Sequence, residues 1–179
     1  MKNDEKGFTL VELLISLVIF AVVVTAVFSF MLAGTRSYST VTNRLNLNVQ
    51  SQLTLNQLDS YIADCNACLY FSGNKLYVVD QNADGTYTAN LFELKADNCI
   101  YYGSGAASPY GSTGNFVCTV SSDELLAENI TAFSVSPESP DGVNMVSAVV
   151  TVTFSNNSAT ISGTRTIALR NMPAVATVG

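Results

Sequence analysis

An uninterrupted apolar segment near the start of the chain constrains its fold more than any other feature. From Leu13 to Thr35 the sequence runs for 23 residues without a charge, and Glu12 and Arg36 bound it. As an α-helix, which rises 1.5 Å per residue, this segment is long enough to cross the roughly 30 Å hydrocarbon core of a bilayer. We therefore expect one membrane-spanning helix with the body of the protein outside the cytoplasm.

Glu12 needs a physical explanation, because an unpaired carboxylate inside a membrane costs a few kcal/mol. If the chain is cut between Gly7 and Phe8, the new amino terminus is a cation one helical turn from Glu12. In a bundle of such helices, the carboxylate of one protein can meet the amine of the next. Each charge then finds its partner only in the assembly, so that Glu12 sets the register of packing.

Two simpler interpretations of the segment stay open. In a secretory signal peptide, Lys2 and Lys6 would form the basic flank and Ala26 the small residue at the cleavage point, giving a start near Val27. The apolar run is longer than the roughly 7 to 15 residues typical of such a signal, and an acidic residue at its head is unfavourable. In a plain single-span anchor, Glu12 would have no role.

The stretch KGFTLVELLISLVIF, residues 6–20, closely resembles the prepilin-type cleavage and methylation motif of type IV pilins and type II secretion pseudopilins. The resemblance implies that a leader ending in Lys6-Gly7 is removed, that Phe8 is then N-methylated, and that Glu12 pairs with a neighbouring subunit's amino terminus. Many major pilins carry a helix-kinking proline where this chain has Ser29. That difference favours a minor pilin or a pseudopilin, and the stretches LAENITAFSV and GTRTIALRN resemble those of the larger minor pilins and J-type pseudopilins.

The resemblance also implies a role and partners. The chain would be a structural subunit and not an enzyme, built into a pilus or a secretion filament. Its partners would be the prepilin peptidase, other pilin or pseudopilin subunits and the inner-membrane assembly platform. It would be a single-pass cytoplasmic membrane protein before assembly and part of an extracytoplasmic or cell-surface filament afterwards. A membrane-anchored extracellular binding module is the alternative from another class.

The helical pattern continues past the apolar segment. Apolar residues recur mostly at steps of three or four, as in an amphipathic helix: Tyr38, Val41, Leu45, Val49, Leu55, Leu58 and Ile62. We expect a helix from Phe8 to about Ile62 whose second half packs this stripe against the rest of the chain. The expected divisions are a leader (1–7), a transmembrane and assembly helix (8–35), its amphipathic continuation (36–63) and a β-rich extracytoplasmic head (64–179).

The sequence pattern of the head predicts strands joined by short connections. The Asp84-Gly85 step predicts a hairpin turn, Asn156-Asn157 another turn, and the Gly/Ser-rich residues 103–115 a loop. We expect five to seven strands, mostly antiparallel. A long helix packed on such a sheet is an α+β fold, which is also the fold that the resemblance to type IV pilins implies.

The composition of the head disfavours two classes of function. Beyond residue 62 there are four basic residues against ten acidic ones, so the head would repel the phosphates of nucleic acid. Histidine is absent from the whole chain. Because histidine is the commonest general base, its absence lowers the expectation of catalysis.

The four cysteines, Cys65, Cys68, Cys99 and Cys118, all follow the apolar segment. An even number outside the cytoplasm predicts one or two disulfides, and the sequence leaves the three possible pairings open. Cys65 and Cys68 also have the spacing of a redox C-x-x-C pair, the feature that a thiol oxidoreductase would use. No second pair of that spacing exists to complete a zinc site.

A last candidate site is the opening of a calcium loop. Asp80, Asn82 and Asp84 stand at alternate positions before Gly85, but Leu91 occupies the twelfth position, where a calcium loop needs a bidentate acid. A polar hairpin tip is therefore the preferred interpretation. We expect no cofactor, with calcium kept as the alternative.

Overall fold

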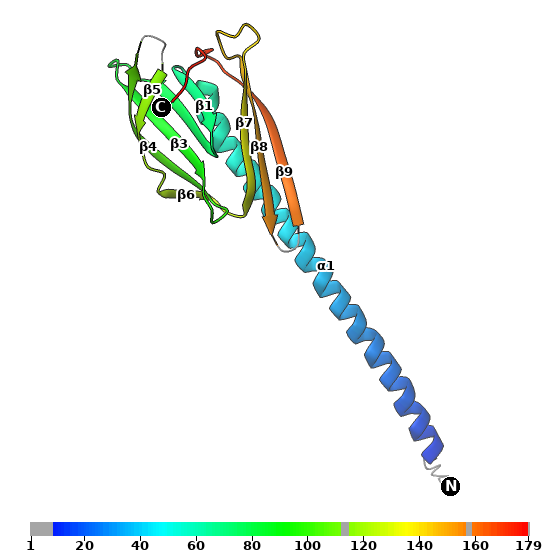
Figure 1. Cartoon of the computed structure of the whole chain (residues 1–179). Helices are drawn as coiled ribbons and strands as arrows, with labels where there is room; N and C mark the ends of the chain where they lie inside the picture. The colour runs from blue at the N-terminus through cyan, green and yellow to red at the C-terminus, as the bar shows by residue number, and fades with distance from the viewer. Residues whose placement is uncertain (1–8, 112–114, 157–158, 179) are drawn as a thin grey trace. The chain divides into compact units, whose positions relative to one another are not determined.

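The computed structural model describes residues 9–111, 115–156 and 159–178 (Figure 1). These residues form a helix followed by strands, which are α1 (Leu10–Asp64), β1 (Cys68–Ser72), β2 (Lys75–Gln81), β3 (Tyr87–Leu94), β4 (Ile100–Tyr110), β5 (Asn115–Thr119), β6 (Glu124–Ala127), β7 (Ile130–Glu138), β8 (Ser147–Asn156) and β9 (Ala159–Ala168). The α+β fold predicted from the sequence is confirmed. The chain divides into two compact units, Met1–Thr42 and Asn43–Gly179.

The described part of the first unit is helical from Leu10 onward, and its apolar side chains face outward. Phe20 is 69% exposed and Phe30 is 81% exposed. By length and composition this helix can cross a membrane. The hydroxyl side chains of the apolar segment each donate to a backbone carbonyl one turn earlier, as Ser16 does to Glu12 at 2.7 Å and Ser29 to Thr25 at 2.8 Å. Thr25 and Thr35 do the same, so these hydroxyls need no water inside a bilayer.

In the second unit, α1 buries Leu55, Leu58 and Ile62 as expected, but not the whole predicted stripe. The buried residues are Leu47, Ser51, Thr54, Leu55, Leu58 and Ile62. Leu45 and Val49 are exposed, so placing them in one buried stripe with Leu55 was wrong. Helical residues advance 100° each, which puts Val49 and Leu55 about 120° apart around the axis. Tyr38 and Val41, in the first unit, are exposed as well.

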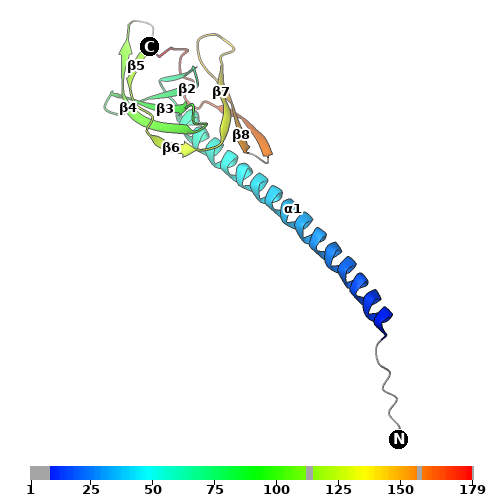
Figure 2. The ribbon, with the colours of Figure 1, turned by 60° about the horizontal axis from the view of Figure 1, so that its bottom comes forward.

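The strands of the second unit form two sheets, where the sequence predicted one. The larger has the order β1-β2-β3-β4-β5, with β6 also pairing with β4, and the smaller has the order β7-β8-β9. All these strand pairs are antiparallel. Figure 2 shows the two sheets side by side over the C-terminal part of α1.

Two apolar clusters hold this unit together. The first core cluster lies among α1 and both sheets and includes Leu58, Phe92 and Phe154. The second core cluster lies on the larger sheet and consists of Cys68, Val79, Ala89, Ala107, Phe116 and Ala176, with Cys118 and Val178 packed against it. Cys68 and Leu69 belong to different clusters because successive strand residues point to opposite faces of a sheet.

Strand β4 corrects the expected loop at residues 103–115. The strand continues through Gly103 and Gly105 to Tyr110. A Cβ atom on Gly103 would lie 1.8 Å from the carbonyl oxygen of Ser121, and one on Gly105 would lie 2.3 Å from that of Thr119. The glycines are therefore present because the segment between β5 and β6 runs close along the edge of β4 with which both strands pair, and not because the chain turns there.

Candidate functional site

The candidate assembly site is the first turn of α1, which Thr9 caps. The backbone N–H of Glu12 donates to the carbonyl oxygen of Thr9 at 3.0 Å and lies 3.3 Å from its side-chain Oγ1. A threonine followed three residues later by glutamate is the pattern of a capping box. The sequence interpretation missed this role of Thr9, although the T-x-x-E spacing indicates it. Gly7 and Phe8, the expected processing residues, lie outside the described residues.

Glu12 thus has a local reason for its position as well as the expected role in assembly. A carboxylate in the first turn of a helix interacts favourably with the helix dipole, by about 0.3–1 kcal/mol at an exposed position. Placing that carboxylate in an apolar environment without a partner costs a few kcal/mol. Because the local gain is smaller than this cost, capping alone does not account for a charge at the head of a membrane segment. The pairing of Glu12 with a cation of another subunit stays a prediction.

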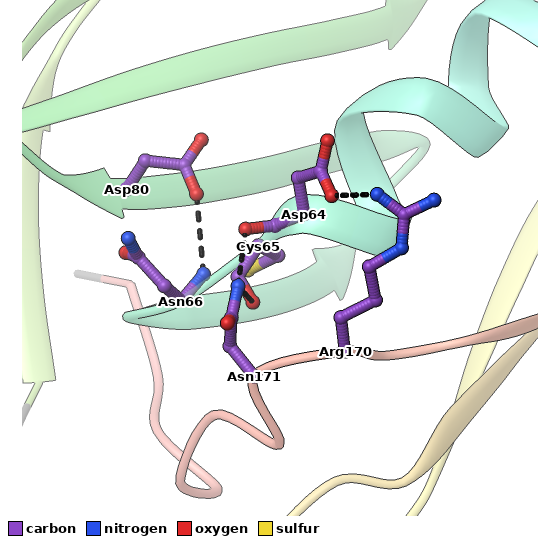
Figure 3. Close-up of polar contacts among 6 residues, drawn as sticks. All are labelled: Asp64, Cys65, Asn66, Asp80, Arg170 and Asn171. Atoms are coloured by element: carbon purple, nitrogen blue, oxygen red, sulfur yellow. Dashed lines mark hydrogen bonds and ion pairs between the residues drawn. The ribbon is translucent and has the colours of Figure 1, made fainter.

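The opposite end of α1 is held by residues far away in sequence, as Figure 3 shows. The backbone N–H of Arg170 donates to the carbonyl oxygen of Ala63 at 3.0 Å, and the Asn171 side chain donates to that of Asp64 at 2.8 Å. The Arg170 guanidinium also pairs with the Asp64 carboxylate. The last carbonyls of a helix lack intrahelical partners, and a cation near them is favourable. These contacts fix the end of the helix to the head.

The three residues of the calcium hypothesis have partners within the protein. The Asp84 carboxylate accepts from the Thr86 backbone N–H at 2.9 Å and from its hydroxyl at 2.6 Å. The Asn82 amide donates to the hydroxyls of Thr86 and Thr88. Asp80 accepts from the backbone N–H of Asn66 at 3.2 Å, as Figure 3 shows. Among the described residues, no group of three or more acidic, cysteine or histidine residues is gathered for a metal, and calcium binding stays untested.

The four cysteines are free thiols in the structure, two of them buried (Cys65 and Cys68) and two half-buried (Cys99 and Cys118). Burial raises the pKa of both Cys65 and Cys68 to about 12. A reactive C-x-x-C pair needs the opposite, a thiol whose pKa is lowered so that the thiolate exists near neutral pH. The geometry therefore disfavours the thiol oxidoreductase interpretation.

Comparison with known proteins supports the interpretation of the amino-terminal segment. Residues 2–28 match the family model described as the prokaryotic N-terminal methylation motif. The match supports a type IV pilin-like family for this chain. The matched range includes the expected cleavage point between Gly7 and Phe8, the capping residue Thr9 and the acidic residue Glu12. No curated protein and no solved structure gave a significant match.

The motif supports several further statements about the chain. It indicates a subunit of the pilin or pseudopilin type, and such proteins are structural. It implies processing by a prepilin peptidase and assembly with other pilin subunits. The motif and the exposed apolar helix together support a membrane-anchored protein.

Proposed function

We propose that the chain is a minor pilin, a structural subunit of a type IV pilus or a related filament. The observation that carries the proposal is the methylation motif at residues 2–28, which leads directly into an exposed helix able to cross a membrane. A type II secretion pseudopilin has the same two features and is the second candidate. The presence of Ser29 in place of a helix-kinking proline is compatible with either candidate.

The proposed assembly exchanges lipid for other subunits around the apolar helix. Before processing, the helix is solvated by lipid and the head lies outside the cytoplasm. Removal of the leader after Gly7 creates an ammonium group on Phe8, one turn from Glu12. In the filament this ammonium group neutralises the Glu12 carboxylate of an adjacent subunit. The buried charges then stabilise only the register in which they meet.

The head offers a second surface to neighbouring subunits. Leu45, Val49 and Leu53 follow one another at steps of four along α1, and each is 58% exposed. Leu53 and Leu125 also line a groove of about 460 Å³, together with Gln50. The side-chain oxygen of Gln50 is buried and has no hydrogen-bond partner among the described residues. An adjacent pilin-like subunit that covers this surface would shield the leucines and could donate to that oxygen.

The variant Glu12→Gln tests the proposal, with Glu124→Gln in the exposed part of the head as a matched control. We expect both variants to be cleaved and to show a methylated Phe8 by mass spectrometry. In Glu12→Gln the buried amine loses its anionic partner, and breaking such a pair costs about 3–5 kcal/mol. Its incorporation into sheared filaments should therefore fall at least about tenfold relative to Glu124→Gln. A chain that begins near Val27 would show release by signal peptidase and refute the proposal.

A further inference from the structure

Cys68 and Cys118 lie in the same apolar cluster, although they belong to strands at the two ends of the larger sheet. Cys68, in β1, is fully buried in the second core cluster, and Cys118, in β5, packs against that cluster. Cys118 is also close enough to contribute to the raised pKa of Cys68, whose main cause is burial. The fold thus brings Cys68 and Cys118 near one another although β1 and β5 lie at opposite ends of the strand order.

The remaining cysteines are placed differently. The Cys65 thiol belongs to the first core cluster and donates to the carbonyl oxygens of Cys68 at 3.3 Å and Val79 at 3.6 Å. Val79 is the ladder partner of Cys68, so Cys65 lies against the backbone of β1 and β2. The Cys68 side chain belongs to the second core cluster, on the other face of the sheet, although Cys68 is near enough to contribute to the raised pKa of Cys65.

Cys99 does not share a core cluster with Cys68 or Cys118. Its thiol is half-buried and lies 3.6 Å from the carbonyl oxygen of Asp97, outside both core clusters. Of the pairs that four cysteines allow, Cys68 with Cys118 is the one whose side chains the fold brings into a common environment.

We propose that Cys68 and Cys118 are a disulfide site that joins β1 to β5 once the head is outside the cytoplasm, with Cys65 and Cys99 left as thiols. The inference rests on the proposed function in one respect, which is the location of the head. It goes beyond that function by assigning a covalent modification and the pair of residues that carry it.

The oxidant is a protein disulfide of an extracytoplasmic dithiol–disulfide oxidoreductase. The Cys118 thiolate attacks one sulfur of that disulfide, and a mixed disulfide forms while the other donor sulfur leaves as a thiolate. The Cys68 thiolate then attacks the Cys118 sulfur, and the donor departs as a dithiol carrying the two electrons. The two protons lost by the cysteines are taken up by the donor thiolates.

Because Cys68 is buried in the folded head, the Cys68–Cys118 bond forms during folding and not after it. The pKa of Cys68 in the folded head is raised to about 12, so almost no thiolate exists there at neutral pH. Because the thiolate is the nucleophile, exchange occurs before the C-terminal residues Ala176 and Val178 close over the second core cluster. After folding, the same burial protects the bond from external thiols.

Peptide mapping of the full chain, extracted from membranes with detergent, tests the assignment. Free thiols are alkylated under denaturing, non-reducing conditions, and chymotrypsin then cuts between Cys99 and Cys118. Fragmentation of the linked peptide is expected to join Cys68 to Cys118, with Cys65 and Cys99 alkylated. Any other pairing, or alkylation of all four cysteines in a head that external protease can reach, overturns the inference.

A head found inside the cytoplasm would refute the proposed function and leave the pairing to be decided separately. For that case the chain is refolded in detergent with oxidised glutathione, and the same peptide map decides the pair.

Stability measurements separate a bridge from simple packing. Cys68→Ala, Cys118→Ala and the double variant should lower the melting temperature by a similar amount, roughly 10 °C, because each removes the same bond and none buries a hydroxyl. Dithiothreitol should lower the melting temperature of the parent by a similar amount, and Cys99→Ser is the control that should melt as the parent does. Additive losses, or a parent unaffected by reduction after unfolding and refolding, would contradict the bridge.

Discussion

At the scale of single residues, Asp80 carries a charge that the folded head disfavours. The carboxylate is half-buried, and desolvation raises its pKa above the ordinary value of 3.8, with the nearby Asp64 adding to the rise. A group whose pKa is raised on folding contributes stability that is present at low pH and lost as the pH increases through the folded pKa. Asp80→Asn should therefore be more stable than the parent at pH 7.5, by less than about 1 kcal/mol because the site is partly solvated.

Denaturant midpoints of the intact chain in detergent at pH 7.5 and pH 3.5 check this prediction. The gain of Asp80→Asn should shrink at the lower pH. Asp97→Asn is a control of opposite sign, because the Tyr101 hydroxyl donates to Asp97 and lowers the pKa of that carboxyl. Its stability contribution is present at neutral pH and lost as the pH falls through the lowered pKa, so the stability lost in Asp97→Asn should be larger at pH 7.5 than at pH 3.5. Loss of stability in both variants at pH 7.5 would contradict the assignment for Asp80.

Some residues at the two ends of α1 can be recognised from the sequence and others cannot, for a physical reason. Roles for Gly7, Phe8 and Glu12 can be proposed from the sequence because they depend on a fixed local order, and these roles stay predictions. The cap made by Thr9 can likewise be recognised from the sequence, because it depends on a spacing of three. Arg170 and Asn171 could not be predicted as caps of α1, because they lie 106 and 107 residues from their partners and only the folded head brings them there.

At the scale of elements, periodicity predicted the helix but only part of the face it buries. The pattern contained two stripes on different faces, one with Leu45 and Val49 and the other with Leu55, Leu58 and Ile62. The buried face also contains Ser51 and Thr54, whose short side chains permit close packing but carry no hydrophobic signal. Gly163 of β9 shows this closeness, since a Cβ atom there would lie 2.5 Å from the Ser51 hydroxyl oxygen.

The close approach of the segment between β5 and β6 to β4 gives a prediction for β4. In Gly103→Ala the new methyl group meets backbone atoms of Ser121 and Ser122, which cannot rotate away as a side chain could. The segment between β5 and β6 must shift, and overpacking of this kind costs about 1–3 kcal/mol. The free energy of unfolding, from urea titration of the head's tyrosine fluorescence, should fall by that amount.

Gly34→Ala is the matched control, because no atom lies within 4 Å of the added Cβ and the residue is in the exposed helix of the first unit. It should leave the unfolding of the head unchanged. Equal stability of Gly103→Ala and the parent would mean that the segment between β5 and β6 packs less closely on β4 than the structure shows.

At the scale of the whole molecule, both units leave apolar side chains without a protein partner. In the first unit these belong to the membrane-capable helix, and lipid can cover them. In the second unit Leu45, Val49 and Leu53 are exposed on α1. Assembly into a filament would account for both sets, because the motif implies contacts with other pilin subunits.

Val49→Asp separates assembly from folding. Val49 is largely exposed in the single chain, so the change should leave membrane insertion and the melting temperature of the head close to those of the parent. In a filament the same carboxylate would be buried without a partner, at a cost of about 3–5 kcal/mol. Incorporation into sheared filaments, measured by quantitative immunoblotting against the membrane fraction, should fall at least about tenfold.

Asn48→Asp places the same charge one residue away, about 100° around the helix axis, on a polar part of the surface. It should assemble as the parent does, since its carboxylate stays in water. If both variants were excluded from filaments, the added charge and not the apolar surface would be responsible. If Val49→Asp assembled as well as Asn48→Asp, the surface of Leu45, Val49 and Leu53 would not be an interface between subunits, and the helix of the first unit would account for assembly without it.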